Sequence, residues 1–488
     1  MKKSAAAFSL GAVSVAGFSP FDLPFVTVLA LAGLIALWLD DEHPGWTGFC
    51  FGLGLFLFGV SWIYVSLHDF GGMPMPIALL ATLLFCAFLS LYPAAAGKIQ
   101  SKIPASPFAR AVFVIPSILA LTDWVRGWLF TGFPWLSLGY SQTNHSPLSG
   151  FAPIFGVYGI SLLCAACAGL LYAIAKPLRR KTSILLLFAI LSIGLLLGKI
   201  EWTRPSGSPV TVSLLQGNIP QNLKWTDSAL QDTLDTYMKM VLASKSRLII
   251  LPETAIPLFY TDVPPGYLDM FEAHAKKNGG DVVTGLAEQL PYHEKTYYNS
   301  VFDFGVSQSP SYRKSHLVPF GEYVPIAPVF GWLFDLMNMP MSDFSAGSID
   351  QKPMQAAGER LAVDICYEDV FGEEVIRQLP RATMLVNVSD DAWFGDSIAP
   401  RQHLEIAQMR TLETGRMMLR STNTGMTAII DRNGKVVKQI PPFEERSLEG
   451  FAQGYSGYTP YIFWGNHAFL FLAALMLLPG LAKFFRKK

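Results

Sequence analysis

The sequence predicts an α/β layered domain inserted between transmembrane helices, with seven helices before the domain and one after it. Three observations predict this fold class. Residues 1–200 form a succession of long apolar runs, each near the roughly 20 residues that a helix needs to span a bilayer. The next block alternates short strand-like runs with helical stretches. Only 15% of the 488 residues are charged, against about 25% in soluble domains.

The apolar runs define the expected membrane region. Helices are expected near 5–20, 22–39, 46–67, 74–97, 107–125, 155–176 and 182–200, with an eighth at 467–485. The first run follows two lysines, as the apolar part of a signal peptide also does. Because a second apolar run follows almost at once, a retained helical hairpin is the simpler interpretation.

Basic residues at the breaks between these helices predict the orientation. In an eight-helix count, the basic clusters at 2–3, 98–110, 176–181 and 483–488 all fall on one side of the membrane. By the positive-inside rule this side is cytoplasmic. We therefore expect both termini in the cytoplasm, residues 201–466 on the far side, and residues 467–488 as a last helix with a basic tail.

Within residues 201–466, short apolar runs have the length and composition of buried strands. They lie at 210–216, 247–253, 281–286, 361–366 and 383–389. Helical stretches at 227–244, 264–277 and 401–418 separate several of them. This alternation predicts sheet packed against helices, in which functional residues gather at the carboxyl ends of strands.

Three residues stand at such strand ends: Glu253, Lys314 and Cys366. Singly, each has an ordinary interpretation, as a solvated acid, a surface lysine and a small buried thiol. Together they fit acyl transfer. A thiol nucleophile needs a base for its proton, which Glu253 could accept, and Lys314 could stabilise the oxyanion. Lys314 would also offset the acidic residues beside Cys366, which otherwise raise a thiol pKa.

Other classes of site find little support. The eight histidines show no metal-ligand spacing, so we expect no metal. The remaining four cysteines lie in apolar runs, where the Cys164–Cys167 pair suits helix packing better than redox chemistry. A formal net charge of +0 gives no reason to expect nucleic acid as a partner.

Several motifs carry a family resemblance. "LPETAIP", "YRKSHLVPFGEYVP", "DICYEDVF", "VNVSDDAWFGDS" and "RSTNTGMTAIIDRNG" resemble the ordered motifs of the nitrilase superfamily and its Glu–Lys–Cys triad. "QGNIPQNLKW", "DWVRGWLFTGFPWLSLGYSQ" and the helices resemble its membrane-embedded branch, the apolipoprotein N-acyltransferase family, along nearly the whole chain.

The resemblance implies a nitrilase-like αββα sandwich on the periplasmic side of a bacterial inner membrane, and a reaction without a cofactor. Cys366 would take an acyl chain from phosphatidylethanolamine as a thioester, with Glu253 as general base and Lys314 as oxyanion stabiliser. The acyl group would then pass to the N-terminal amine of diacylglyceryl-cysteine in an apolipoprotein. Matching supporting positions are Glu322, Glu368, Tyr367 and Trp225.

Two alternatives stay open at this stage. A membrane-anchored nitrilase-type amidase would use the same triad but pass its acyl group to water. A transporter with an appended binding domain is a different class, although the spans carry few polar residues and no obvious broken helix pair. Asp123 and Arg126 have either a structural role, in which they pair or snorkel to the membrane interface, or a functional one, in which they contact a phospholipid headgroup; the structural role is favoured.

The apolar stretch "VFGWLFDLMNMPMSDFSAG" (329–347) has two interpretations. It is either a helix packed on the domain's own core or a methionine-rich lid that contacts acyl chains. On the lid hypothesis, Trp332→Asp and Met337→Asp abolish acyl transfer and leave the protein folded. The measurement is turnover beside the unfolding midpoint of each variant, and unchanged turnover would refute the lid.

Overall fold

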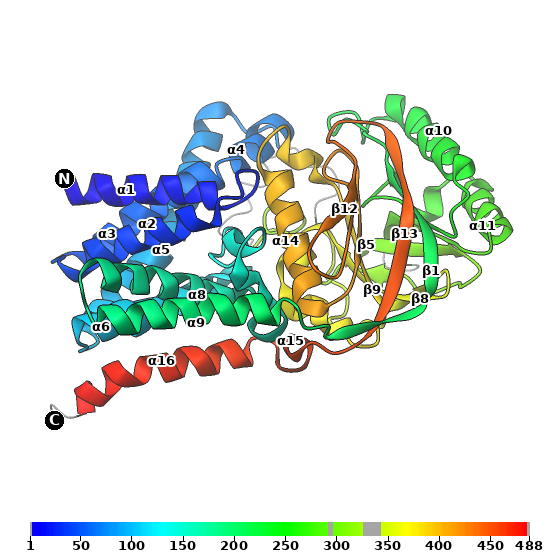
Figure 1. Ribbon diagram of the computed structural model, residues 1–488. Helices are drawn as coiled ribbons and strands as arrows, with labels where there is room; N and C mark the ends of the chain where they lie inside the picture. Colours follow the sequence, from blue (N-terminus) through cyan, green and yellow to red (C-terminus); the bar gives the residue numbers. More distant parts are fainter. Residues whose placement is uncertain (1, 291–295, 326–342, 486–488) are drawn as a thin grey trace.

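The structure is a computed structural model that describes residues 2–290, 296–325 and 343–485. A helical bundle built from both ends of the chain lies beside a layered sheet domain, and both termini lie at the end of the bundle away from that domain (Figure 1). The bundle comprises α1, α2, α3, α5, α7, α8, α9 and α16, at Lys2–Ser14, Pro24–Leu39, Pro44–Gly59, Met75–Lys102, Ile115–Arg126, Ala152–Ala175, Arg180–Leu197 and His467–Phe485.

The length and composition of the bundle helices show its membrane character. Over the described ranges, four segments are long and apolar enough to cross a membrane: Met75–Lys102, Pro107–Arg126, Pro147–Ala175 and Arg180–Leu197. A fifth is counted if the bent pair Pro44–Gly59 and Ile63–Phe70 forms one span, and Pro24–Leu39 and His467–Gly480 are apolar but shorter. The count of seven helices before the domain and one after it stays a prediction.

The continuous helix expected at 46–67 is wrong. The chain bends by 58° between α3 and the helical segment that follows it. At the bend, the carbonyl oxygen of Gly59 accepts hydrogen bonds from the Trp62 indole (3.1 Å) and the Gln402 amide (3.2 Å). Because side chains take this carbonyl, it does not continue the helical ladder, and sequence periodicity does not reveal such a partner.

Small residues let α3 and α5 approach closely. A Cβ atom added at Gly48 would lie 2.2 Å from the carbonyl oxygen of Pro93 in α5. Close backbone approach of this kind is the usual way in which membrane helices associate, since burial of apolar surface adds little in lipid. On the outside of the bundle, α9 exposes Leu185, Phe188 and Leu196, as expected for a lipid-facing helix.

The sheet domain contains two sheets in the part of the chain that the structure describes. The first has the order β13-β1-β2-β4-β5-β6, at Arg446–Gly457, Thr203–Gln216, Leu248–Ile250, Asp281–Gln289, Tyr297–Gly305 and Tyr312–Arg313, with β3 (Ile256–Phe259) paired to β4. The second has the order β12-β11-β10-β9-β8-β7, at Val436–Gln439, Ala428–Ile430, Met418–Thr422, Met384–Ser389, Glu359–Ile365 and Met354–Ala356. All five expected strands are present.

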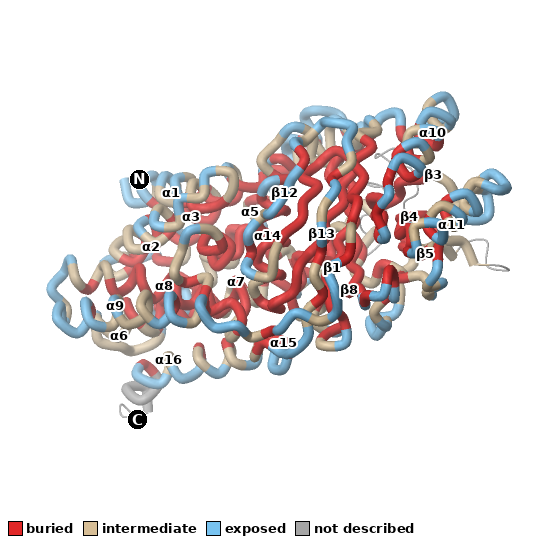
Figure 2. The backbone as a smooth tube through the Cα atoms, turned by 45° about the vertical axis from the view of Figure 1, so that its right-hand side comes forward, coloured by how far each residue is buried: buried red, intermediate tan, exposed pale blue. Residues whose placement is uncertain are grey.

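The sheets face each other across an apolar core and carry helices on their outer faces, which makes an αββα sandwich. Alternate residues of β1, β2, β8 and β9 fill the space between the sheets, where Figure 2 shows buried chain. Helices α10 (Asp227–Ala243) and α11 (Tyr267–Lys277) cover the first sheet, and α14 (Ala399–Thr414) covers the second. The expected helix at 401–418 ends earlier, because Gly415 adopts φ +62° and β10 then begins.

Helix α14 joins the two parts of the molecule (Figure 1). Its outer side meets the bundle, and nearly all its residues are buried. Gln402 accepts hydrogen bonds from the indoles of Trp62 (3.2 Å) and Trp135 (2.8 Å), and Glu413 accepts one from the backbone N–H of Val157 (2.8 Å). These contacts fix the position of the sheet domain relative to the helical bundle.

The close contact of α3 and α5 gives a test of the bundle. Gly48→Ala should lower the free energy of unfolding by about 1–3 kcal/mol, because backbone atoms of Pro93 occupy the space of the new methyl group. Gly45→Ala, in the same helix, is the matched control, since its Cβ would lie 3.4 Å from the nearest atom. The measurement is the unfolding midpoint of the purified full chain in detergent. Equal midpoints would contradict the close helix contact.

Candidate active site

The three predicted catalytic residues follow strands of both sheets. Glu253 comes just after β2, Lys314 directly after β6 and Cys366 directly after β8. The neighbours β1, β2 and β4 run parallel, as do β8, β9 and β10, so their carboxyl ends gather at one edge of the sandwich. Lys314 Nζ lies 3.4 Å from Glu253 Oε1. The charges of both residues act on the Cys366 thiol.

The backbone of Cys366 has a left-handed conformation, φ +53°, at the junction of β8 and a short helical turn, Cys366–Val370. Residues other than glycine rarely adopt this conformation, and it persists only where neighbours hold it. Here the Asn387 amide donates to the carbonyl oxygen of Cys366 (3.1 Å), and the N–H of Ile365 donates to Glu368 (2.8 Å). The turn therefore ends the strand sharply at the thiol.

Glu253 is a buried acid with a partner on each oxygen. Its Oε1 accepts a hydrogen bond from Asn299 Nδ2 (2.7 Å), and its Oε2 accepts one from the backbone N–H of Asp390 (2.9 Å). Asn299 also donates to Glu322 Oε1 (3.1 Å), so it joins the two carboxylates. Sequence reasoning missed Asn299, because the run "NSVFDF" also contains Ser300 and Asp303 and nothing in the run distinguishes Asn299 from them.

Lys314 is buried, and its ammonium lies between two carboxylates. Its Nζ is 2.9 Å from Glu322 Oε1, so the structure brings this predicted supporting residue into contact. Burial alone would lower the pKa of Lys314, but the charges of Glu322 and Glu253 raise it above its ordinary value. The lysine is therefore a permanent positive charge at the site. A fixed cation of this kind can stabilise an oxyanion without donating its proton away.

The Cys366 thiol has a pKa well above its ordinary value. Burial is the main cause and the charge of Glu253 adds to it, while Lys314 acts in the opposite direction. The expectation that Lys314 favours the thiolate is thus correct in sign, but burial and Glu253 outweigh it. The resting group is a neutral S–H. Its attack on a carbonyl then requires a base that accepts the proton.

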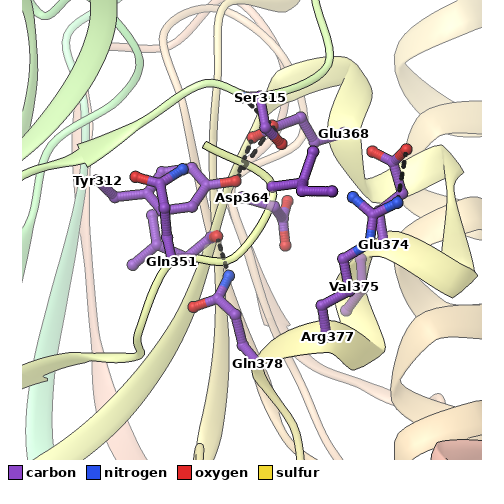
Figure 3. A pocket seen from close by; sticks show the side chains of 11 residues that line it. Tyr312, Ser315, Gln351, Asp364, Glu368, Glu374, Val375, Arg377 and Gln378 are labelled. Carbon is purple, nitrogen blue, oxygen red and sulfur yellow. Dashed lines mark hydrogen bonds and ion pairs between the residues drawn. The ribbon is translucent and has the colours of Figure 1, made fainter. Parts of the chain in front are cut away.

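Glu368 binds backbone N–H groups and the Tyr312 hydroxyl; Figure 3 shows its contacts with Ser315 and Tyr312. Its carboxylate accepts hydrogen bonds from the N–H groups of Ser315 (2.7 Å), His316 (3.1 Å) and Ile365 (2.8 Å), and from the Tyr312 hydroxyl. Burial raises its pKa, which these donors partly oppose. Glu368 therefore ties the segment after Lys314 to the turn that carries Cys366.

Tyr367 connects the turn Cys366–Val370 to the bundle. Its hydroxyl donates to the carbonyl oxygen of Gly132 (3.1 Å), in the loop after α7, and its ring packs on Phe371. Trp225 lies at the end of the segment after β1, and its ring centroid is 5.9 Å from Lys224 Nζ. Both supporting aromatic residues thus belong to segments that fix the site. The lid residues Trp332 and Met337 lie outside the described residues.

The charged pair at the membrane boundary is internal. Arg126 contacts Asp123 and donates to the carbonyl oxygen of Trp135 (2.7 Å), while Asp123 accepts from the N–H of Leu138 (3.1 Å) and the hydroxyl of Ser161 (3.0 Å). Both side chains are buried. The two residues pair with each other, in agreement with the favoured structural interpretation, and their contacts hold the loop that receives Tyr367.

A buried charge cluster beneath the turn was missed by sequence reasoning. Arg420 pairs with Asp369 (3.2 Å) and Asp391 (2.8 Å), and His403 lies 2.9 Å from each of the same carboxylates. The two acids outweigh burial and Arg420, and so raise the pKa of His403 to about 9. The only signal was that Arg420, Asp369 and Asp391 occur within the quoted motifs. Through Asp369, which belongs to the turn Cys366–Val370, the cluster holds this turn in place.

The arrangement supports nucleophilic acyl chemistry. A thiol, a buried carboxylate and a fixed ammonium meet at one edge, which supplies nucleophile, base and oxyanion partner. In the described ranges, no group of three or more His, Cys, Asp or Glu side chains could hold a metal ion.

Comparisons with known proteins match both parts of the chain. A family model described as the apolipoprotein N-acyltransferase N-terminal domain matches residues 10–170, and one described as carbon-nitrogen hydrolase matches residues 211–449. An apolipoprotein N-acyltransferase of Nitrosomonas europaea is 52% identical, covering 97% of this chain and 96% of the relative. One of Chromobacterium violaceum is 42% identical, covering 99% of this chain and 94% of the relative.

The contacts of Glu368 give a test of the site's framework. Glu368→Gln should lower the free energy of unfolding by about 2–3 kcal/mol, because an amide cannot accept all the backbone N–H groups that the carboxylate holds. Glu374→Gln is the matched control, since this neighbouring acid in Figure 3 forms only partly exposed pairs with His316 and Arg377 and should cost less than about 1 kcal/mol. Unfolding midpoints in detergent give the comparison. Similar losses in both variants would contradict the tying role.

Proposed function

The chain belongs to the apolipoprotein N-acyltransferase family, and we propose that it acylates apolipoproteins in two steps through a thioester on Cys366. The donor is a phospholipid, phosphatidylethanolamine, and the acceptor is the N-terminal amine of diacylglyceryl-cysteine. The observation that carries this proposal is the contact of Lys314 with Glu253 and Glu322 at the site of Cys366, a half-buried free thiol on which the charges of Lys314 and Glu253 act. No other group in the described site combines a nucleophile, a base and a fixed cation.

In the first step Glu253 accepts the thiol proton as the sulfur of Cys366 attacks an ester carbonyl of the phospholipid. Lys314 stabilises the negative charge that develops on the carbonyl oxygen. The ester C–O bond then breaks. The lysophospholipid leaves as an alcohol with the proton that Glu253 returns, and the acyl group remains on sulfur.

In the second step the neutral amine of the acceptor attacks the thioester carbonyl, and Lys314 again faces the oxyanion. Glu253 accepts a proton from the nitrogen and returns it to the departing sulfur. The products are an amide and the free Cys366 thiol, so the enzyme is restored. The raised pKa of that thiol favours its return to S–H.

Contacts with the bundle support a lipid donor. Tyr367, next to the nucleophile, binds the loop at Gly132, and Ser66 donates to the carbonyl oxygen of Trp393 (2.7 Å). The exposed aromatic rings of Trp128 and Phe130 lie in the same loop as Gly132. Aromatic side chains of this kind concentrate at membrane–water interfaces. In this proposal the acyl chain leaves the bilayer beside this loop, which Tyr367 connects to Cys366.

The membrane topology completes the proposal. We place seven helices in residues 1–200, the catalytic domain in residues 201–466 and the last helix with its basic tail in residues 467–488. Both termini face the cytoplasm and the catalytic domain faces the periplasm of a bacterium with an inner membrane. The basic clusters and the common location of both termini in Figure 1 support this orientation.

The test follows acyl label from donor to acceptor. Purified full chain incubated with acyl-labelled phosphatidylethanolamine should carry label that hydroxylamine releases. Cys366→Ala should remove the label, Cys164→Ala in α8 should retain it, and Glu253→Gln should slow labelling about 10²- to 10⁴-fold because the base is lost.

A diacylated lipopeptide with a free amine should then discharge the label onto itself. Label that persists in Cys366→Ala would refute the thioester. Label that is lost to water at the same rate with and without the lipopeptide would indicate a hydrolase instead of a transferase.

A further inference from the structure

The general base depends on a backbone group for one of its oxygens. Glu253 Oε1 has Asn299 and Lys314 as neighbours, whereas the described hydrogen bond to Oε2 comes from the N–H of Asp390 alone (2.9 Å). A carboxylate accepts a proton efficiently only if its free lone pair points at the donor. The position of the Asp390 backbone therefore decides how Glu253 is aimed.

Asp390 is itself held by side chains from two other segments. Its carboxylate forms an ion pair with Lys224 Nζ, and its Oδ1 accepts a hydrogen bond from Asn423 Nδ2 (3.1 Å). The side chains of Lys224 and Asp390 are only 2% and 4% exposed, so water does not screen the pair.

The same ammonium also reaches the segment of the base. Lys224 Nζ lies 3.2 Å from the hydroxyl of Thr254 and 3.4 Å from the carbonyl oxygen of Glu253. One buried cation thus contacts the residue that carries the base and the residue whose N–H orients it. These residues are far apart in sequence, and the described contacts of Lys224 join them directly.

Lys224 also fixes the segment on which it lies. This segment follows β1 without regular secondary structure and places Trp225 beside the ammonium, at 5.9 Å from Nζ to the ring centroid. Removal of the ion pair would release this segment from the base as well. Lys224, the lysine of the motif "QGNIPQNLKW", therefore connects this segment to Glu253.

A buried ion pair is weak evidence for stability alone, because apolar residues of similar volume often stabilise a fold as well or better. We infer that Lys224 is a positioning residue, which aims Glu253 through Asp390 and holds the Trp225 segment against the site. The inference rests on the proposed function of Glu253 as general base. Lys224 itself touches neither the thiol nor, in the proposed mechanism, the substrate.

The test compares four variants of the full chain in mixed micelles with acyl-labelled phosphatidylethanolamine. Lys224→Met should slow thioester formation about 10- to 100-fold with little change in KM. The variant loses the orientation of the Glu253 carboxylate and keeps the binding of the phospholipid. Its solvent deuterium isotope effect should rise as proton transfer becomes limiting. Lys224→Arg should recover part of the rate, since it restores the charge. Lys276→Met, an exposed lysine of α11 that pairs with Glu272, should match the wild type.

A fourth variant separates positioning from folding. Lys224→Met leaves Asp390 buried and unpaired, so it also lowers the unfolding midpoint. Lys224→Met/Asp390→Asn should recover that midpoint, because no unpaired charge remains, but not the rate, because Met cannot bind Thr254 or the Glu253 carbonyl. All rates are measured well below the midpoints.

Recovery of the wild-type rate together with the midpoint would overturn the inference and leave Lys224 a structural residue. An unchanged isotope effect and rate in Lys224→Met would overturn it directly. Full acylation by Glu253→Gln would instead refute the proposed function of Glu253, so the two failures are distinguishable.

Discussion

The buried charge balance around Lys314 is the constraint on which the site depends. An ammonium removed from water is costly unless opposite charges and hydrogen-bond acceptors surround it. Glu322 and Glu253 supply those charges, and Asn299 holds the two acids together. The strands that carry these residues must therefore keep their register, and the segment after β6 must stay close to the end of β2. The relative positions of Lys314, Glu253 and Glu322 follow from this requirement.

Both parts of the molecule position the turn that carries Cys366. The sandwich supplies the strand ends, while the bundle supplies the seat of α14 and the loop that receives Tyr367. The turn at Cys366 is held by Asn387 from within the domain and is supported from below by the cluster around Arg420. The turn that carries the thiol is thus fixed relative to the helical bundle as well as to its own sheet.

Sequence reasoning reached the layered fold, its strands and the three strand-end residues, because apolar period and strand-end position are local signals. It missed Asn299, Lys224 and His403, whose importance comes from partners on distant segments. It also expected a straight helix at 46–67, since the amide that takes the Gly59 carbonyl belongs to a residue 343 positions away. The spacing of residues along the chain does not predict contacts between segments that are distant in sequence. Only the folded arrangement brings them together.

The neutral state of the resting thiol has a chemical consequence outside catalysis. Oxidants and disulfides react with the thiolate far faster than with S–H, so a cysteine with a raised pKa is a poor target for them. Because burial and the charge of Glu253 raise the pKa of Cys366, little thiolate is available to such reagents. The same electrostatics that make a base necessary for attack also make this cysteine resistant to oxidation.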